Sequence, residues 1–321
     1  MNDLPADLTL PKRAPSRTSA EPASSVSVIV VVYKTGEALE PALTSVLQDP
    51  IVTELVIVNN GASTEEIRKL HRLSATDDRI TLIEGQGNVG FARGANLGAH
   101  KARGRVLVFV NPDAFIRPGC LAHLTQSIEN QPVPCIVGGR VLNPDMTEQR
   151  GGRRGEITPF TAVISLGRLG RFVPAWRKYE VHLENQAMPE GVIAVPTISG
   201  ACFCMRREDF DAVAGFDEGY FLHVEDVDLC WRVRQAGGKV LFHPQAEVVH
   251  LGHTSRASPM RVEFYKGMGL VRYFSKRAST PGETLAAWLL SPLILLATLA
   301  RPLLWSLRPV RPVALETDRP D

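Results

Sequence analysis

The sequence predicts an α/β fold in which helices flank an open, mostly parallel β-sheet, followed by an apolar helical tail near the C-terminal end. Two observations predict it. The run VSVIVVV at residues 26–32 is continuously apolar and β-branched, as expected for a strand buried on both faces of a parallel sheet. Runs of this kind alternate with segments whose apolar residues recur at helical spacing. This alternation is typical of helices that pack on both faces of such a sheet.

The first half of the chain supplies these elements in a regular order. Residues 37–48 place Leu39, Leu43 and Val46 on one helical face, and the run ELVIV at 54–58 predicts a second strand. Ligands of open α/β sheets bind beyond the carboxyl ends of the strands, so we expect functional residues in the loops that follow them. The same patterns predict helices over 64–73 and 90–103, and strands over 80–83, 105–110, 138–142 and 246–249.

The composition is that of a globular protein with one large domain. A chain of 321 residues with 44% hydrophobic and 22% charged residues can bury a large core. Its 36 basic and 34 acidic residues give a net charge of +2, which gives no electrostatic case for nucleic acid as a partner. The five cysteines match no common zinc spacing. Because Cys202 and Cys204 lie in an apolar run, we expect reduced core residues in a cytosolic protein.

The two ends of the chain differ from the middle. Residues 1–25 are rich in Pro, Ser, Ala and charge, so we expect a disordered leader, and likewise a disordered tail over 309–321. Residues 283–308 are mostly apolar, but Pro292 and Arg301 interrupt them, and about 20 apolar residues are needed to span a bilayer. We therefore expect a helix that lies in or on the cytoplasmic leaflet. Packing on the domain, or on a second copy in a homodimer, is the alternative.

Three strand-end loops are polar and small enough to hold a ligand. Tyr33 follows the first strand, Asn59 and Asn60 follow the second, and Asn111 and Asp113 follow the strand at 105–110. A carboxylate in this position can hold Mg²⁺ or Mn²⁺ while the metal bridges phosphate oxygens. The tripeptide Asn-Pro-Asp recurs at 143–145, where we interpret it as a simple turn.

Residues 87–98, GNVGFARGANLG, form a glycine-rich helix start. Glycines there allow backbone amides to approach a diphosphate, and an arginine can add charge-assisted hydrogen bonds. Tight helix packing also demands small residues, so the pattern alone is a weak signal. The candidates in this segment are Asn88, Gly90, Arg93, Gly94 and Asn96.

Residues 216–231, FDEGYFLHVEDVDLCW, carry the strongest chemical signal. Glu225, Asp226 and Asp228 alternate with apolar residues, which would half-bury charge unless a catalytic base or a metal site required it. The alternative is a favourable helix start in which Asp228 pairs with Arg232 on an exposed face.

Taken together, these blocks resemble a known family. VSVIVVVY, ELVIVNNGAS, GNVGFARGANLG, VFVNPD, SGACFCMRREDF, GFDEGYFLHVEDVDLCWRVRQAG and HPQAEVVH occur in the order seen in family 2 inverting glycosyltransferases, and are similar to the rhamnosyltransferase-like branch. The resemblance covers residues 25–255. It implies the Rossmann-like, A-type glycosyltransferase fold over 26–275, with a nucleotide-sugar half at 26–115 and an acceptor half at 116–275.

The resemblance also implies roles. Asp226 would be the general base with Glu225 beside it, and Asp113 would hold the divalent metal near His250. The partners would be a nucleotide-diphospho-sugar donor, a glycan or polyprenyl-linked acceptor and the cytoplasmic face of the membrane. The implied donor residues are Tyr33, Asn59, Asn60, Asn88, Gly90, Arg93, Gly94, Asn96 and Asn111, and the implied acceptor residues are Gly200 and Asp217.

Three positions depart from the family pattern. Asn59 stands where many relatives have Asp, although its amide oxygen could accept a hydrogen bond from a pyrimidine ring N–H. Lys34 follows Tyr33 where Asn is commoner, and His253 occupies a place usually given to Gly. The donor identity is therefore open.

A basic and aromatic insertion at residues 150–189 matches none of the family blocks. It predicts either a solvated loop with a short helix, or a contact with a phosphate-bearing acceptor or the membrane. Two other functions stay open: a catalytically inactive nucleotide-sugar-binding or scaffold protein, and a nucleotidyltransferase. The latter lacks a glycine-rich, lysine-bearing N-terminal loop and would leave the Glu225–Asp226 pair unexplained.

Overall fold

The computed structural model describes residues 25–129, 131–132, 134–167, 169–252, 254–255 and 257–306. Ser25 apart, the expected leader 1–25 lies outside these residues, as do the tail 309–321 and His253.

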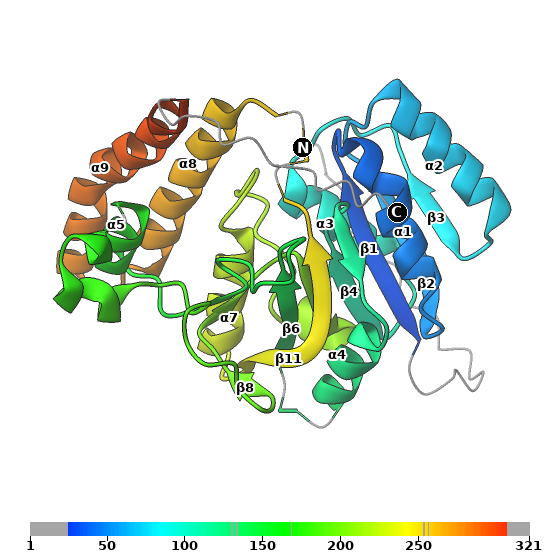
Figure 1. Cartoon of the computed structure of the whole chain (residues 1–321), viewed down its shortest axis with the longest axis horizontal. Helices are drawn as coiled ribbons and strands as arrows, with labels where there is room; N and C mark the ends of the chain where they lie inside the picture. The colour runs from blue at the N-terminus through cyan, green and yellow to red at the C-terminus, as the bar shows by residue number, and fades with distance from the viewer. Residues whose placement is uncertain are drawn as a thin grey trace, which may run out of the picture.

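The described residues form a nine-stranded mixed sheet in the order β3-β2-β1-β4-β10-β6-β11-β5, with β8 beside β11 (Figure 1). The first four strands of this order are parallel, whereas β10 runs antiparallel between β4 and β6. The mostly parallel α/β fold is thus confirmed: β6 and β11 also pair in parallel, and of the described strands in this sheet only β10, β5 and β8 run antiparallel to their neighbours. The strands are β1 Val26–Val32, β2 Val52–Asn59, β3 Ile80–Ile83, β4 Val106–Val110, β5 Ala114–Ile116, β6 Cys135–Leu142, β8 Ile193–Ala194, β10 Cys202–Arg206 and β11 Lys239–His250. A separate pair joins β7 Arg153–Arg154 to β9 Thr197–Ile198.

Helices cover both faces of the sheet because successive residues of a buried strand point to opposite sides. Val28 and Val30 of β1 join the core under α1, α2 and α4, whereas Ile29 and Val31 join the core under α3, α6 and α7. The helices are α1 Leu39–Leu47, α2 Thr64–Thr76, α3 Phe91–Lys101, α4 Cys120–Glu129, α5 Pro159–Gly167, α6 Arg207–Ala212, α7 Glu225–Gln235, α8 Pro259–Arg277 and α9 Pro281–Ser306, with short 3-10 turns η1 Gly36–Ala38, η2 Leu169–Arg171 and η3 Pro174–Tyr179.

The strands expected at residues 26–32 and 80–83 have the expected bounds. The helix expected over 37–48 is a 3-10 turn followed by α1. The strand expected at 246–249 is the end of the longer β11. All five cysteines are buried and unpaired, as expected for reduced core residues.

At one end of the molecule, α9 packs on α8 and α5 (Figure 1). Its residues 281–302 are long and apolar enough to cross a membrane, with a mean hydropathy of 1.7. One face of α9 packs on the domain through Ile294 and Thr298. The other face exposes Leu285, Trp288, Leu289, Leu293 and Leu296. Packing on the domain therefore accounts for one face of this helix and leaves the other apolar face exposed.

Candidate active site

Two sequence-distant segments meet where β4 ends and β10 begins. Cys202 pairs with Val110 in antiparallel register, which sets the loop after β4 beside the segment before β10. The Asn111 backbone N–H donates a hydrogen bond to the Ala201 carbonyl (2.9 Å), and the Gly200 N–H donates to Oδ2 of Asp226 (3.0 Å). The backbone of Gly200 and Ala201 thus contacts both the loop that carries Asp113 and the side chain of Asp226.

Asp113 is buried against the end of β11. Its Oδ1 lies 3.1 Å from Nε2 of His250, and Thr254 Oγ1 donates a hydrogen bond to its Oδ2 (2.9 Å). Burial raises the pKa of Asp113, but His250 and Thr254 outweigh it and hold the pKa below the ordinary value. Asn111 Nδ2 also lies 3.2 Å from the same His250 nitrogen. Three predicted residues therefore converge here.

The chemistry of this pair fits a divalent cation. Gln149 donates through Nε2 to the His250 carbonyl (2.9 Å), so its Oε1 faces Nδ1 of His250 at 2.7 Å and must accept a proton from it. Nε2 then faces the carboxylate oxygen, and either a proton on Nε2, which is the form that lowers the Asp113 pKa, or a cation must lie between them. Gln149 orients the imidazole as a supporting residue behind a metal ligand does.

No group of three or more His, Cys, Asp or Glu residues within the described segments is placed to hold a metal. Asp113 and His250 would therefore supply two ligands, and substrate oxygens or water the others, as is usual for Mg²⁺ at phosphate sites. The second Asn-Pro-Asp is a turn, as expected. It positions Gln149, whose Nε2 also donates to Asn143.

Asp226 is the second residue of α7 and is held by three donors. The Gly200 N–H and Arg154 Nη2 both donate to Oδ2, and the Val227 N–H donates to Oδ1 at 2.8 Å. Arg154 comes from β7 and also donates to the Ile198 carbonyl at 2.8 Å. Sequence reasoning missed Arg154 because the insertion matched no family block. It is a member of the basic cluster at 150–189, but nothing in the pattern singled it out.

Glu225 is buried beside this carboxylate. Its Oε2 has no hydrogen-bond partner within the described part of the chain. Burial, reinforced by the charge of Asp226, raises the pKa of Glu225 to about 8, although Arg154 opposes the shift. Burial thus favours the neutral form of Glu225 at neutral pH.

A strained turn presents both residues. His223 and Val224 have φ angles of 67° and 73°, a left-handed conformation that a β-branched residue rarely adopts. The turn is held from two sides. The Phe91 N–H donates to the Phe221 carbonyl (2.8 Å), and a Cβ at Gly269 of α8 would lie 2.9 Å from the His223 carbonyl oxygen. Strain at such a position is a frequent mark of a functional site.

Asp228 accepts a hydrogen bond from Arg232 (2.6 Å), as the helix-start interpretation predicted. The same interpretation placed this pair on an exposed face, and that part is wrong. Asp228 is fully buried and also accepts from Lys276 Nζ (2.8 Å) and Tyr220 Oη (3.2 Å). Those partners lie on α8 and in the preceding loop, where a local helical pattern could not reveal them.

The asparagines expected to bind the donor are largely occupied by the protein itself. Asn60 donates to Asn88 Oδ1 and accepts from the Val89 N–H (2.9 Å), so the pair fixes the loop before α3. Asn59 Oδ1 accepts from the Gly61 and Ala62 N–H groups. Both lone pairs of this oxygen are thus used within the protein, and the expected pyrimidine contact stays a prediction.

Glu84 is a residue that sequence reasoning missed on this side. It follows β3, and its Oε1 accepts from Asn59 Nδ2 at 2.9 Å. The negative charge absent at Asn59 is therefore supplied by a neighbour from the next strand. Tyr33 lies against the same loop, since a Cβ at Gly61 would be 3.2 Å from its ring.

The glycine-rich segment has a packing explanation. A Cβ at Gly90 would lie 2.6 Å from the Phe221 carbonyl oxygen, and one at Gly94 would lie 3.0 Å from Val31. Asn96 was expected at the donor, but both polar ends of its amide hydrogen-bond the backbone of Phe216 at 2.9 Å. These bonds give Asn96 a structural role, and its donor contact stays a prediction. Arg93 remains exposed and lies 3.7 Å from Glu218.

The two expected acceptor residues have structural partners. Gly200 presents its N–H to Asp226, and a Cβ there would lie 3.3 Å from the Cβ of Asp226. Asp217 forms ion pairs with Arg272 (2.9 Å) and Lys276 (2.8 Å) of α8. Although burial raises the pKa of Asp217, these two cations lower it well below the ordinary value. The Asp217 side chain thus links the loop before α7 to α8 through these two ion pairs.

Comparison with known proteins supplies independent information. A family model described as Glycosyl transferase family 2 matches residues 27–213, more than half of the chain. Over 146 residues the chain is 29% identical to the N-acetylglucosaminyl-diphospho-decaprenol L-rhamnosyltransferase of Mycobacterium tuberculosis, covering 45% of this chain and 46% of that protein. It is 26% identical over 246 residues to the O-antigen biosynthesis protein RfbC of Myxococcus xanthus, covering 72% of this chain and 18% of that protein. The chain thus matches less than half the length of either relative.

Two solved structures share the architecture. The mannosyltransferase PcManGT from Pyrobaculum calidifontis, in complex with GDP-Man and Mn²⁺, superposes with a TM-score of 0.55 at 17% identity and covers 89% of this chain and 76% of that chain. TarS from S. aureus, in complex with UDP-GlcNAc, gives a TM-score of 0.54 at 14% identity and covers 86% and 72%. At these identities the likeness shows the fold alone.

Proposed function

This chain belongs to glycosyl transferase family 2 and has the A-type fold, and from that premise we propose that it is an inverting glycosyltransferase. It would move rhamnose or a similar hexose from a nucleotide-diphosphate donor to a hydroxyl group of a lipid-linked cell-surface glycan, as the names of its relatives suggest. One observation carries the proposal. The backbone of Gly200 and Ala201 touches both the Asp226 carboxylate and the loop that bears Asp113.

The chemistry requires one displacement. Asp226 accepts the proton of the acceptor hydroxyl while that oxygen attacks the anomeric carbon, and the bond from this carbon to the diphosphate breaks on the opposite face. The new bond therefore has inverted configuration. Asp113 and His250 would hold Mg²⁺ or Mn²⁺, which supplies positive charge to the leaving diphosphate.

The neighbours of Asp226 prepare it for this role. Gly200 and Val227 fix the direction of the carboxylate through their backbone N–H groups. Glu225 shares the site but is mostly neutral at pH 7, so it can donate a hydrogen bond to the acceptor but is a poor base.

A second candidate is a catalytically inactive protein that binds nucleotide sugar or acts as a scaffold. The ion pair between Arg154 and Asp226 favours it, because a guanidinium bound to the base opposes proton transfer to that carboxylate. Binding of nucleotide sugar without any release of nucleoside diphosphate would support this alternative.

We also propose peripheral attachment to the cytoplasmic face of the membrane. The exposed face of α9 is apolar over residues 285–296, and Met260, Phe264 and Met268 extend it on α8. Trp288 is 71% exposed, which suits the interfacial region of a bilayer. A homodimer through the same face stays a prediction.

The direct test is an assay of the purified full-length chain with dTDP-rhamnose, UDP-sugars and GDP-sugars, each with Mg²⁺ or Mn²⁺. The acceptor is a short-chain prenyl diphospho-N-acetylglucosamine in detergent. We expect nucleoside diphosphate release with one donor, dependent on metal and acceptor, and a product of inverted configuration. Absence of release with every donor, or a product of retained configuration, would contradict the proposal.

A further inference from the structure

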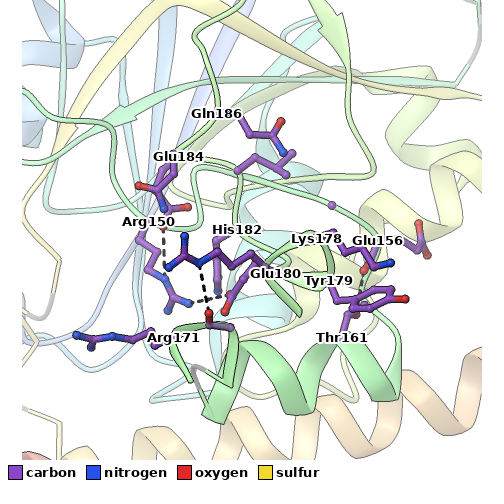
Figure 2. Close-up of a pocket in the computed structure, with 15 residues that line it drawn as sticks. Arg150, Glu156, Thr161, Arg171, Lys178, Tyr179, Glu180, His182, Glu184 and Gln186 are labelled. Carbon is purple, nitrogen blue, oxygen red and sulfur yellow. Dashed lines mark hydrogen bonds and ion pairs between the residues drawn. The ribbon is translucent and has the colours of Figure 1, made fainter. Parts of the chain in front are cut away.

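The basic insertion folds around a cavity of about 670 Å³ (Figure 2). Residues between 150 and 186 line it, and they come from α5, the 3-10 turns η2 and η3, and the segment that follows them. The expectation of a solvated loop with a short helix is thus incomplete, because the insertion encloses a space large enough for a ligand.

The charge of this cavity is unbalanced. Its three glutamates have cationic partners: Glu180 and Glu184 share Arg150, at 3.7 and 3.5 Å (Figure 2), and Glu156 pairs with Arg234 and Arg277. The other cations in the lining are Arg171, Arg177 and Lys178. Within the described segments, no carboxylate lies within ion-pair distance of these three. The cavity therefore offers positive charge to a ligand.

A partly buried imidazole adds a second polar feature. Nδ1 of His182 is buried and has no hydrogen-bond partner in the described part of the chain. Burial, together with the charges of Arg150 and Arg154, lowers the pKa of His182 to about 3. The imidazole is therefore neutral, and it can donate one hydrogen bond to an anion without carrying charge itself.

The cavity adjoins Asp226. Arg154 forms a backbone bridge with His182, and the next residue, Gly155, donates its N–H to the Val181 carbonyl (2.7 Å). His182 and Gly155 both line the cavity, while the Arg154 guanidinium binds Asp226. Arg154 thus connects a backbone segment beside the cavity to the expected base.

On its other side the cavity adjoins apolar surface. Phe160, Phe172, Trp176 and Tyr179 of the insertion are all at least 36% exposed, and Phe172 is 80% exposed. The insertion also lies against the C-terminal helices, because α5 packs on α9. The same insertion thus carries the cation-lined cavity, the arginine that binds Asp226 and exposed aromatic side chains.

We propose that this cavity binds the diphosphate group of a polyprenyl-linked acceptor, with the attached sugar directed to Asp226 and the prenyl chain laid over the exposed aromatic residues toward α9. This inference rests on the proposed function. Arg177 and Lys178 contact the phosphate oxygens, where guanidinium and ammonium groups bind well. The prenyl chain would then cover the exposed aromatic residues of the insertion.

The test compares two double variants of the full-length chain. Arg177→Gln with Lys178→Gln removes two cations of the cavity, and Arg68→Gln with Arg72→Gln removes two exposed cations of α2, at the opposite end of the molecule (Figure 1). We expect the first to raise KM for the prenyl diphospho-sugar at least about tenfold, with KM for the donor unchanged. The second should change neither. An unchanged acceptor KM, or an equal rise for an alkyl glycoside that lacks the diphosphate, would overturn the inference.

Direct binding separates this inference from the proposed function. Farnesyl diphosphate should bind the wild-type chain, and Arg171→Gln, which disturbs no ion pair, should weaken it several-fold even if no transfer is detected. Binding of inorganic pyrophosphate as tight as that of farnesyl diphosphate would indicate a site for free phosphate and overturn the lipid assignment. Failure of the transfer assay with intact, cation-dependent farnesyl diphosphate binding would contradict the proposed function alone.

Discussion

Replacement of Glu225 by glutamine should stabilise this protein at alkaline pH and leave its stability unchanged in acid. The folded-state pKa of Glu225 is raised from 4.5 to about 8, chiefly by burial. Its protonated form therefore stabilises the fold below pH 4.5, and that contribution is lost as the pH rises through about 8. Glutamine is neutral at every pH and has nearly the same shape as protonated glutamate. The variant therefore keeps this stability contribution when the pH rises.

The size of the effect follows from the difference between the ordinary pKa of Glu225 and its pKa in the folded protein. At about 1.36 kcal/mol for each pKa unit, the difference between 4.5 and about 8 corresponds to at most about 5 kcal/mol. Relaxation around the ionised group reduces this limit, so we expect about 1–3 kcal/mol at pH 8.5. Either side chain leaves one buried polar atom unpartnered at the position of Oε2, so this cost cancels in the comparison.

Urea unfolding followed by tryptophan fluorescence measures this at pH 4.5 and pH 8.5. Glu37→Gln, at an exposed glutamate, is the matched control and should behave like the wild type at both values. If Glu225→Gln is no more stable than the wild type at pH 8.5, or gains equally at both pH values, the assignment of Glu225 as a neutral buried acid is refuted.

Three further outcomes are expected. Asp113→Ala should abolish the rise in melting temperature that Mn²⁺ adds to nucleoside diphosphate binding, because a metal ligand is lost; an unchanged rise in thermal shift would place the metal elsewhere. Gly90→Ala should cost more than about 2 kcal/mol in urea unfolding, since Gly90 has a φ of 86° and a new Cβ would lie 2.6 Å from the Phe221 carbonyl oxygen; a neutral effect would mean that this loop yields easily. Trp288→Glu with Leu293→Glu should reduce co-sedimentation with anionic vesicles at least about tenfold without loss of folding, and full retention would argue against membrane contact through α9.

Much of the sheet was predictable because buried parallel strands carry their signal locally. The runs at 26–32 and 80–83 have the expected bounds, and the loops after β1, β2 and β4 lie at the expected edge. The antiparallel direction of β10 was not predictable. Its sequence, CFCMR at residues 202–206, carries no information about the direction of the neighbouring strands.

The candidate site was predictable in its carboxylates but not in their partners. Asp113 and Asp226 follow from motif and strand position, and the Asp228–Arg232 pair follows from helical spacing. Arg154, which binds Asp226, and Lys276, which binds Asp228, lie 72 and 48 residues away and could not be assigned from a local pattern. The amides of Asn59 and Asn96 were assigned to a ligand because a sequence cannot show that backbone groups already use them.

The central claim is that Asp226 is the base and Glu225 is not. It is tested most directly by the rate of nucleoside diphosphate release in Asp226→Asn and Glu225→Gln, measured side by side with the same donor and acceptor. The account predicts that Asp226→Asn lowers kcat at least about a hundredfold while donor binding persists, and that Glu225→Gln retains most of the activity. Loss of activity in Glu225→Gln with activity retained in Asp226→Asn would contradict it.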